Sequence, residues 1–138
     1  MEHLVTFIVA EYLVTKGIII DSKYCYCRYG VRAVKSTNDG KTIAERTYNK
    51  GVIEPINHEW EIEYPSANWI PAPNVYNVIR YLDEHLNIVI IPTYKGHREF
   101  GYDIYFNDNK IDSSSITYHS ITATYNAAIN NFVLKNNN

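Results

Sequence analysis

The sequence of 138 residues lacks the features that mark several large classes of protein. No apolar run approaches the roughly 18 residues that a membrane-spanning helix needs, and the longest runs, 17–20 and 88–92, have the length of strands. The first residues lack the basic segment that opens a signal peptide, so we expect none. The formal net charge is only −2, so overall charge indicates neither a nucleic acid nor a basic partner.

Cysteine is scarce, and the two cysteines, Cys25 and Cys27, lie two residues apart. In a strand both would point to one face, too close for ordinary disulfide geometry, so we expect reduced thiols and a cytoplasmic location. A structural zinc site needs a second pair of ligands, which the sequence does not offer, so we expect no metal. Glycine-rich phosphate loops, serine nucleophile elbows and zinc-protease motifs are missing, so we assign no catalytic residue and no cofactor.

The residues that are present have the balance of a globular protein, with 46% hydrophobic and 20% charged. Isoleucine, asparagine and tyrosine are abundant, and tyrosine alone occurs 13 times. All three have AT-rich codons, so an AT-rich genome explains the excess. A tyrosine-rich recognition surface is the other interpretation, since tyrosine combines a rigid ring with a polar tip. Both interpretations stay open.

Hydrophobic periodicity and turn residues predict an α+β fold, with a largely antiparallel sheet and about three helices packed on it. The helices are expected at 6–16, at 74–86 and from a cap at Thr124 onward, and the strands at 24–35, 41–48, 59–64, 88–94, 101–107 and 114–121. We expect a single domain over 1–138. Its parts are an N-terminal helix with a basic hairpin (1–51), a connecting segment (52–73) and an αβββα unit (74–135).

The basic hairpin is the first candidate site. Residues 23–50 hold seven Lys and Arg against two acidic residues. On one continuous strand, a single face would carry Tyr24, Tyr26, Arg28 and Arg32. Arginine grips phosphate and tyrosine stacks on a base, so these four residues predict a site for a small anionic, nucleotide-type ligand. The alternative is a solvated hairpin whose charges pair with the glutamates of 59–63.

The second candidate is the loop at 95–99, where His97 and Arg98 could serve as a general base and an anion clamp. A solvated polar loop between two strands is the alternative interpretation. We add His97 and Arg98 to the candidate ligand-binding residues.

Ala72-Pro73 precedes the helix at 74–86, which ends at Asn87-Ile88, and Thr124-Tyr125 opens the last helix. In these features the second half of the chain resembles small proteins of Bacteroides-type bacteria and their phages. Those proteins carry Ala-Pro-Thr-Gln, a helix ending Trp-Leu-Arg-Glu-x-His-Asn-Ile, a β-hairpin and a Thr-Tyr-Glu-Glu-Ala-Leu helix. The shared residues are Ala72, Pro73, Leu82, Glu84, Asn87, Ile88, Thr124, Tyr125 and Ala128, and the departures are Tyr81, Asp83 and Leu86. The resemblance implies a phage or mobile-element accessory protein in a host cytoplasm, and it carries over no active-site residue.

These observations predict a non-enzymatic binding protein whose partner is a small anionic ligand or a host protein, with countering of a host defence as one role. The alternatives are a small nucleotide-directed hydrolase that uses His97, His119 or an acid, and a weak nucleic-acid-binding protein. No membrane partner is expected. The edges of an antiparallel sheet and the aromatic content favour a homodimer.

Overall fold

A computed structural model describes residues 3–28, 31–36, 40–48, 51, 53–55, 61–62 and 69–136 of the chain. In chain order the elements are α1 (Phe7–Thr15), β1 (Tyr24–Cys27), β2 (Val31–Ser36), β3 (Thr42–Tyr48), β4 (Ile53–Pro55), β5 (Glu61–Ile62), β6 (Trp69–Pro71), α2 (Val75–Leu86), β7 (Ile88–Gly96), β8 (Glu99–Phe106), β9 (Asn109–Ser113) and α3 (Ile121–Asn136). The strands form sheets in the orders β4-β1-β6, β3-β2-β5 and β7-β8-β9, and every pairing is antiparallel. The predicted α+β class is therefore confirmed.

The chain divides into two compact units, and we describe each by itself. Unit 1 comprises residues 1–20 and 74–138, and unit 2 comprises residues 21–73. The sequence predicts a grouping of the N-terminal helix with the basic hairpin, whereas the structure groups this helix with residues 74–138. A backbone hydrogen bond of 2.7 Å from Val75 N to the His3 carbonyl oxygen joins the two segments of unit 1.

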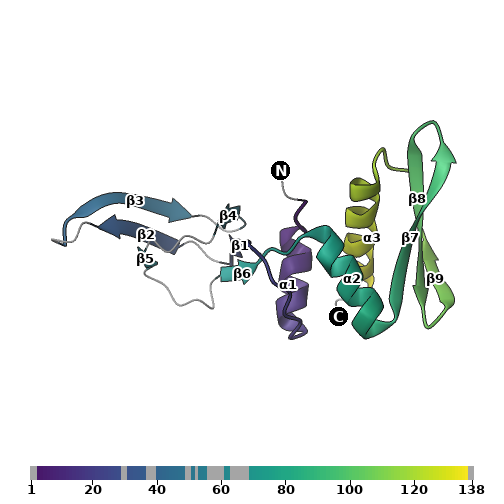
Figure 1. The fold of residues 1–138 in the computed structure, drawn as a ribbon, viewed down its shortest axis with the longest axis horizontal. Helices are drawn as coiled ribbons and strands as arrows, with labels where there is room; N and C mark the ends of the chain where they lie inside the picture. Colours follow the sequence, from purple (N-terminus) through teal and green to yellow (C-terminus); the bar gives the residue numbers. More distant parts are fainter. Residues whose placement is uncertain are drawn as a thin grey trace. The chain divides into compact units, whose positions relative to one another are not determined.

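In unit 1 the three helices lie on one side of the sheet β7-β8-β9 (Figure 1). Helix α2 packs on β7, and α3 packs on both β7 and β8, whereas α1 packs on α3. The expected helix-on-sheet arrangement thus holds for α2 and α3. The core between these layers is apolar, and its buried side chains are Val5, Val9, Ala10, Leu13, Val75, Val78, Leu82, Ile88, Ile90, Tyr102, Ile104, Ala128, Ile129 and Val133.

The helix ends in unit 1 follow the capping residues in the sequence. Gly17, with a φ of 70°, ends α1 in a Schellman arrangement, in which Gly17 N bonds to the Val14 carbonyl and Ile18 N to the Leu13 carbonyl. At α2, the Asn74 side chain accepts a hydrogen bond of 2.9 Å from Tyr76 N. Asn87 ends α2 in the left-handed region, so the chain turns directly into β7.

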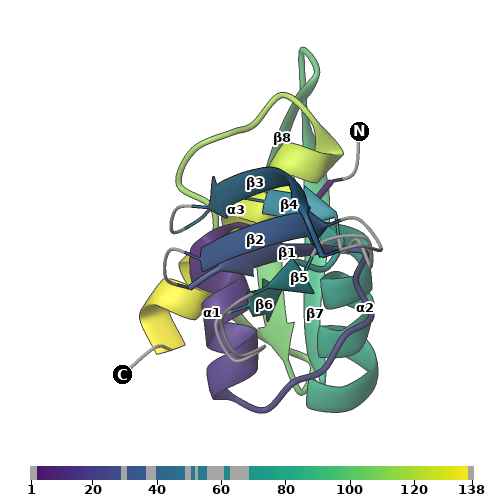
Figure 2. The same ribbon diagram turned by 90° about the vertical axis from the view of Figure 1, so that its left-hand side faces the viewer.

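Unit 2 is built from short strands. Strand β1 pairs with β4 and β6, and β2 pairs with β3 and β5. Figure 2 shows β3, β2 and β5 side by side in that order. Cys25 and Cys27 are buried on β1, and no disulfide joins them. Ile70 on β6 is fully buried.

Two expectations about the strands need correction. The segment 24–35 contains two strands in different sheets, β1 and β2, and not one continuous strand. The third strand of the αβββα unit is β9 at 109–113 and not 114–121, because a two-residue turn at Asn107 and Asp108 returns the chain at once. Of the strand expected at 59–64, only 61–62 lies within the described residues, as β5.

The third correction concerns the start of α3, which begins at Ile121, so the predicted cap at Thr124 is wrong. The Ser120 hydroxyl oxygen accepts from Ala123 N at 3.0 Å and takes the capping position. Thr124 lies inside the helix, fully buried, and its hydroxyl donates to the Ser120 carbonyl at 2.6 Å. None of the helices that the structure describes is long and apolar enough to cross a membrane.

Candidate functional site

The structure distributes the candidate ligand-binding residues over both units. Tyr24 and Tyr26 lie on β1, and Arg28 follows that strand directly. Arg32 lies on β2, in a different sheet, and its side chain falls outside the described part. The single strand face that would have aligned these four residues is therefore not formed.

Tyr26 is the least accessible of the predicted stacking residues. Its side chain is 6% exposed, and burial raises its pKa above the ordinary value of 10.0. Its backbone pairs with Ile53 on one side and Ile70 on the other. A ring with so little exposed surface offers little area for a base to stack on. The stacking role of Tyr26 therefore stays a prediction without support from the structure.

His97 and Arg98 form the two-residue turn of the β7–β8 hairpin in unit 1. Gly96 pairs with Glu99, so His97 and Arg98 are the only residues between the paired ends. Both have a positive φ, 53° at His97 and 59° at Arg98, as a type I′ turn requires. Figures 1 and 2 show the hairpin projecting beyond the helices of its unit. We call residues 94–100 the hairpin tip.

The backbone conformation of this turn does not suit its residues. Asparagine and glycine favour type I′ turns, whereas a left-handed conformation costs other residues roughly 1–2 kcal/mol each. The next turn of the same sheet provides a comparison, because Asn107 and Asp108 adopt a φ of 49° and 68° with side chains that tolerate that region. The hairpin tip thus carries His and Arg at a position where the chain uses Asn and Asp elsewhere.

Two aromatic rings lie next to the turn, one on each strand of the hairpin. Tyr94 and Phe100 are directly paired across β7 and β8, and their ring centroids lie 5.4 Å apart. Tyr94 is 62% exposed, and its hydroxyl oxygen accepts a long hydrogen bond of 3.4 Å from Arg98 N. The ring of Tyr94 therefore lies beside the turn with much of its surface open to solvent.

The charges at the hairpin tip are mostly positive. Lys95, His97 and Arg98 are exposed, and Glu99 is half-buried. Lysine and arginine donate charge-assisted hydrogen bonds to phosphate or carboxylate oxygens, and an exposed tyrosine ring offers a face for stacking. The arrangement can bind an anion that has a flat ring.

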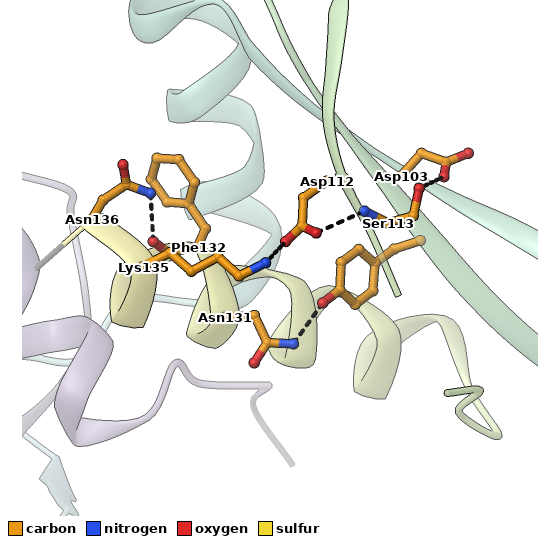
Figure 3. A network of polar contacts seen from close by, with 8 residues as sticks. Asp103, Asp112, Ser113, Asn131, Phe132, Lys135 and Asn136 are labelled. Atoms are coloured by element: carbon orange, nitrogen blue, oxygen red, sulfur yellow. Dashed lines mark hydrogen bonds and ion pairs between the residues drawn. The ribbon is translucent and has the colours of Figure 1, made fainter. Parts of the chain in front are cut away.

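The body of the hairpin is held to α3 by a polar network (Figure 3). Lys135 Nζ lies 2.6 Å from Asp112 Oδ2, and this hydrogen bond raises the pKa of Lys135. Asn131 donates to the hydroxyl of buried Tyr102 at 2.5 Å, and Ser113 Oγ donates to Asp103 at 2.7 Å. These contacts join β8 and β9 to the last helix and so position the base of the hairpin.

The sequence analysis singled out His97 and Arg98 but missed the aromatic residues beside them. Tyr94 and Phe100 are directly paired, but a bulge between Tyr94 and Gly96 leaves two residues between Tyr94 and the turn and one between the turn and Phe100. An alternating pattern alone therefore could not have aligned the two rings. Within the described ranges, no three His, Cys, Asp or Glu side chains gather in a way that could hold a metal ion.

Comparison of the chain with protein-family models, with curated proteins and with solved structures found no match. The site must therefore be interpreted from its own residues.

Proposed function

We propose that this protein is a non-enzymatic binding protein whose hairpin tip takes a small anionic ligand of the nucleotide type. The observation that carries the proposal is the pair of left-handed residues, His97 and Arg98, at the β7–β8 turn. Backbone strain of this kind persists where the surrounding structure enforces it, and it gathers at functional sites. A turn of Asn and Gly would form the hairpin at lower cost but would present no cation.

The neighbouring side chains match such a ligand. Lys95 and Arg98 supply two positive charges for phosphate oxygens, and His97 adds further hydrogen-bonding capacity. The exposed ring of Tyr94 supplies a stacking face for a base. The alternative site for the same ligand lies in unit 2. It would use Tyr24 on β1, Arg28 directly after β1, and Arg32 on β2.

The biological setting stays part of the proposal. The resemblance to small phage and Bacteroides-type proteins supports an accessory role in a host cytoplasm, where the ligand would be a nucleotide signal or the partner a host protein. Countering a host defence is one role such binding would serve. A homodimer is also proposed.

The test is calorimetry of the wild type against a panel of mono-, di- and cyclic nucleotides. Arg98→Glu should weaken binding at least about tenfold, since it replaces an attraction for phosphate by a repulsion. Arg80→Glu is the matched control, because Arg80 is an exposed arginine on α2 and should leave affinity unchanged. Loss of binding in Arg28→Glu/Arg32→Glu but not in Arg98→Glu would move the site to unit 2 and refute the tip.

Salt dependence and product analysis separate the two alternatives. A nucleic-acid partner gives a slope of log K against log salt of about −0.9 per phosphate contact, whereas a compact nucleotide gives a shallower slope. A hydrolase that uses His97 or His119 would convert the nucleotide, which chromatography after incubation detects. An intact nucleotide with a shallow salt slope is the result we expect.

A further inference from the structure

The β7–β8 hairpin contains a bulge directly next to its left-handed turn. Tyr94 pairs with Phe100 and Gly96 pairs with Glu99, so Lys95 is an extra residue on β7 with no opposed residue on β8. Gly96 has a φ of 90°, a conformation that glycine adopts readily and that a residue with a Cβ avoids. The bulge therefore depends on glycine at this position.

The two charged side chains on either side of the bulge are not paired with each other. The ion pairs in the described part of the chain both involve β9 and include neither Lys95 nor Glu99. The Lys95 side chain instead lies over Gly101, where an added Cβ would stand 3.1 Å from Lys95 Cε. Two opposite charges thus lie one pairing step apart, and the observed register does not bring them opposite each other.

A shift of one residue at the tip would bring these charges together and leave the rest of the sheet unchanged. If Lys95 pairs directly with Glu99, the pair of Tyr94 and Phe100 is kept, and the loop consists of residues 96–98. Three-residue hairpin loops adopt a type I turn followed by one left-handed residue. Only the last of the three residues would then have a positive φ, whereas all three have one in the observed register.

The backbone of Glu99 suits either register. The N–H and carbonyl of Phe100 bond to Tyr118, on the side away from β7. By alternation along the strand, the N–H and carbonyl of Glu99 point toward β7. They meet Gly96 in the observed register and would meet Lys95 in the shifted one. Opposite charges that face each other across an antiparallel pair stabilise it, so the shifted register gains an interaction that the observed one lacks.

We propose that the hairpin tip switches between these two registers, and that Glu99 is an autoinhibitory group that occupies Lys95 in the shifted one. The ligand step rests on the proposed function: the nucleotide binds the observed register, where Lys95 is not engaged by Glu99. A phosphate and the Glu99 carboxylate then compete for the same ammonium group. Binding shifts the population toward the observed register by the difference between the affinities of the two registers.

Gly96→Ala tests the switch, because it removes no charge and no ring from the hairpin tip. Alanine disfavours the positive φ of the bulge, so this variant should adopt the shifted register and bind the same nucleotide panel at least about tenfold more weakly. Gly17→Ala is the matched control. Gly17 has a φ of 70° at the end of α1, and a Cβ at either glycine would meet nothing within 4 Å. Gly17→Ala should therefore strain the backbone in a similar way and leave nucleotide affinity unchanged.

Nuclear magnetic resonance tests the registers without any nucleotide. The carbon chemical shifts of His97, which depend on the sign of φ, should indicate a positive φ in the wild type and a negative φ in Gly96→Ala. Relaxation dispersion of the wild type should detect exchange at the tip amides on the microsecond-to-millisecond timescale. Saturation with a nucleotide of the panel should suppress that exchange, because only one register binds.

Glu99→Gln tests the autoinhibitory contact. Loss of the carboxylate raises the affinity for an anion in any register, so the informative quantity is the difference between two backgrounds. The gain in affinity should be at least about threefold larger in Gly96→Ala than in the wild type, because Glu99 engages Lys95 only in the shifted register.

Failure of the switch and failure of the proposed function give different results. If no nucleotide of the panel binds the wild type, the proposed function and the ligand step both fail. If the wild type binds a nucleotide, three results would each overturn the switch and leave the proposed function standing. These are equal affinity in Gly96→Ala, a positive φ of His97 in that variant or no exchange in the wild type, and equal gains from Glu99→Gln in both backgrounds.

Discussion

Replacing Arg98 by glycine should stabilise the protein while it removes a cation from the hairpin tip. Arg98 has a φ of 59°, a conformation that costs a residue with a Cβ roughly 1–2 kcal/mol and costs glycine nothing. Glycine also gives the unfolded chain more conformational freedom, and this lowers the free energy of unfolding by about 0.5–1 kcal/mol. The net expectation is a rise of about 0.5–1 kcal/mol in the free energy of unfolding. The melting temperature should rise by about 2–5 °C.

Two further variants separate the backbone effect from the charge effect. Arg98→Ala removes the same cation but keeps the left-handed cost, so its stability should stay within about 0.5 kcal/mol of the wild type. Asp108 has a φ of 68°, but aspartate adopts the left-handed region at lower cost than arginine does. Asp108→Gly should therefore raise the free energy of unfolding by less than Arg98→Gly does. The assay is urea unfolding followed by circular dichroism, with thermal melts of the same samples.

The reasoning fails if Arg98→Ala stabilises the protein as much as Arg98→Gly does. The gain would then come from removing a charge near Lys95 and not from the backbone. It also fails if Arg98→Gly destabilises the protein, since the turn would then depend on the Arg98 side chain. The proposed function adds a further expectation, that both variants lose nucleotide affinity, so that stability and binding change in opposite directions in the glycine variant.

The remaining predictions concern the core and the base of the hairpin. Leu82→Ala should lower the free energy of unfolding by about 2–5 kcal/mol in urea titrations, because Leu82 is 3% exposed on the inner face of α2; a loss below 1 kcal/mol would contradict the packing. Gly101→Ala should cost about 1–3 kcal/mol, since a Cβ there would lie 2.8 Å from Ser114 Oγ, and much of that loss should disappear in the Ser114→Gly background, as a double-mutant cycle would measure. The hydrogen bond that Lys135 donates to Asp112 raises the pKa of Lys135, so the stabilisation it gives is complete below pH 10.5 and falls as the pH rises through the folded-state pKa. Lys135→Met should remove that alkaline loss from the stability profile, and an unchanged profile would show that the ion pair contributes nothing.

The sequence by itself determined the parts of the fold that rest on local interactions. The apolar spacing of 74–86 predicted α2, and within that helix Val78 and Leu82 are buried, while Ile79 is half-buried. The end of α1 at Gly17 followed from the freedom of glycine to adopt a positive φ. These features depend on residues within a few positions of one another, so a single sequence contains the information.

Other features were decided by contacts between distant segments. The alternating pattern of 24–35 is compatible with one long strand, and only its pairing partners, β4 and β6 for one part and β3 and β5 for the other, divide it. Thr124 suits a helix cap by type, but its full burial belongs to a position inside α3. The free energy gained from a residue's local conformational preference is smaller than that gained from burying its side chain. Tertiary packing therefore overrides the local preference at such positions.

The hairpin tip shows the same division most clearly. His97 and Arg98 were recognisable as a polar loop with chemical potential, but neither residue favours a left-handed turn, so nothing in the sequence predicted their conformation. The register of β7 on β8 is set by the buried pair of Ile90 and Ile104 and by the pairing of half-buried Pro92 with buried Tyr102. It leaves two residues to reverse the chain. The sheet thereby imposes the strained turn and brings Tyr94 and Phe100 beside it, because a strand register is determined by the face that is buried and not by the residues of the turn.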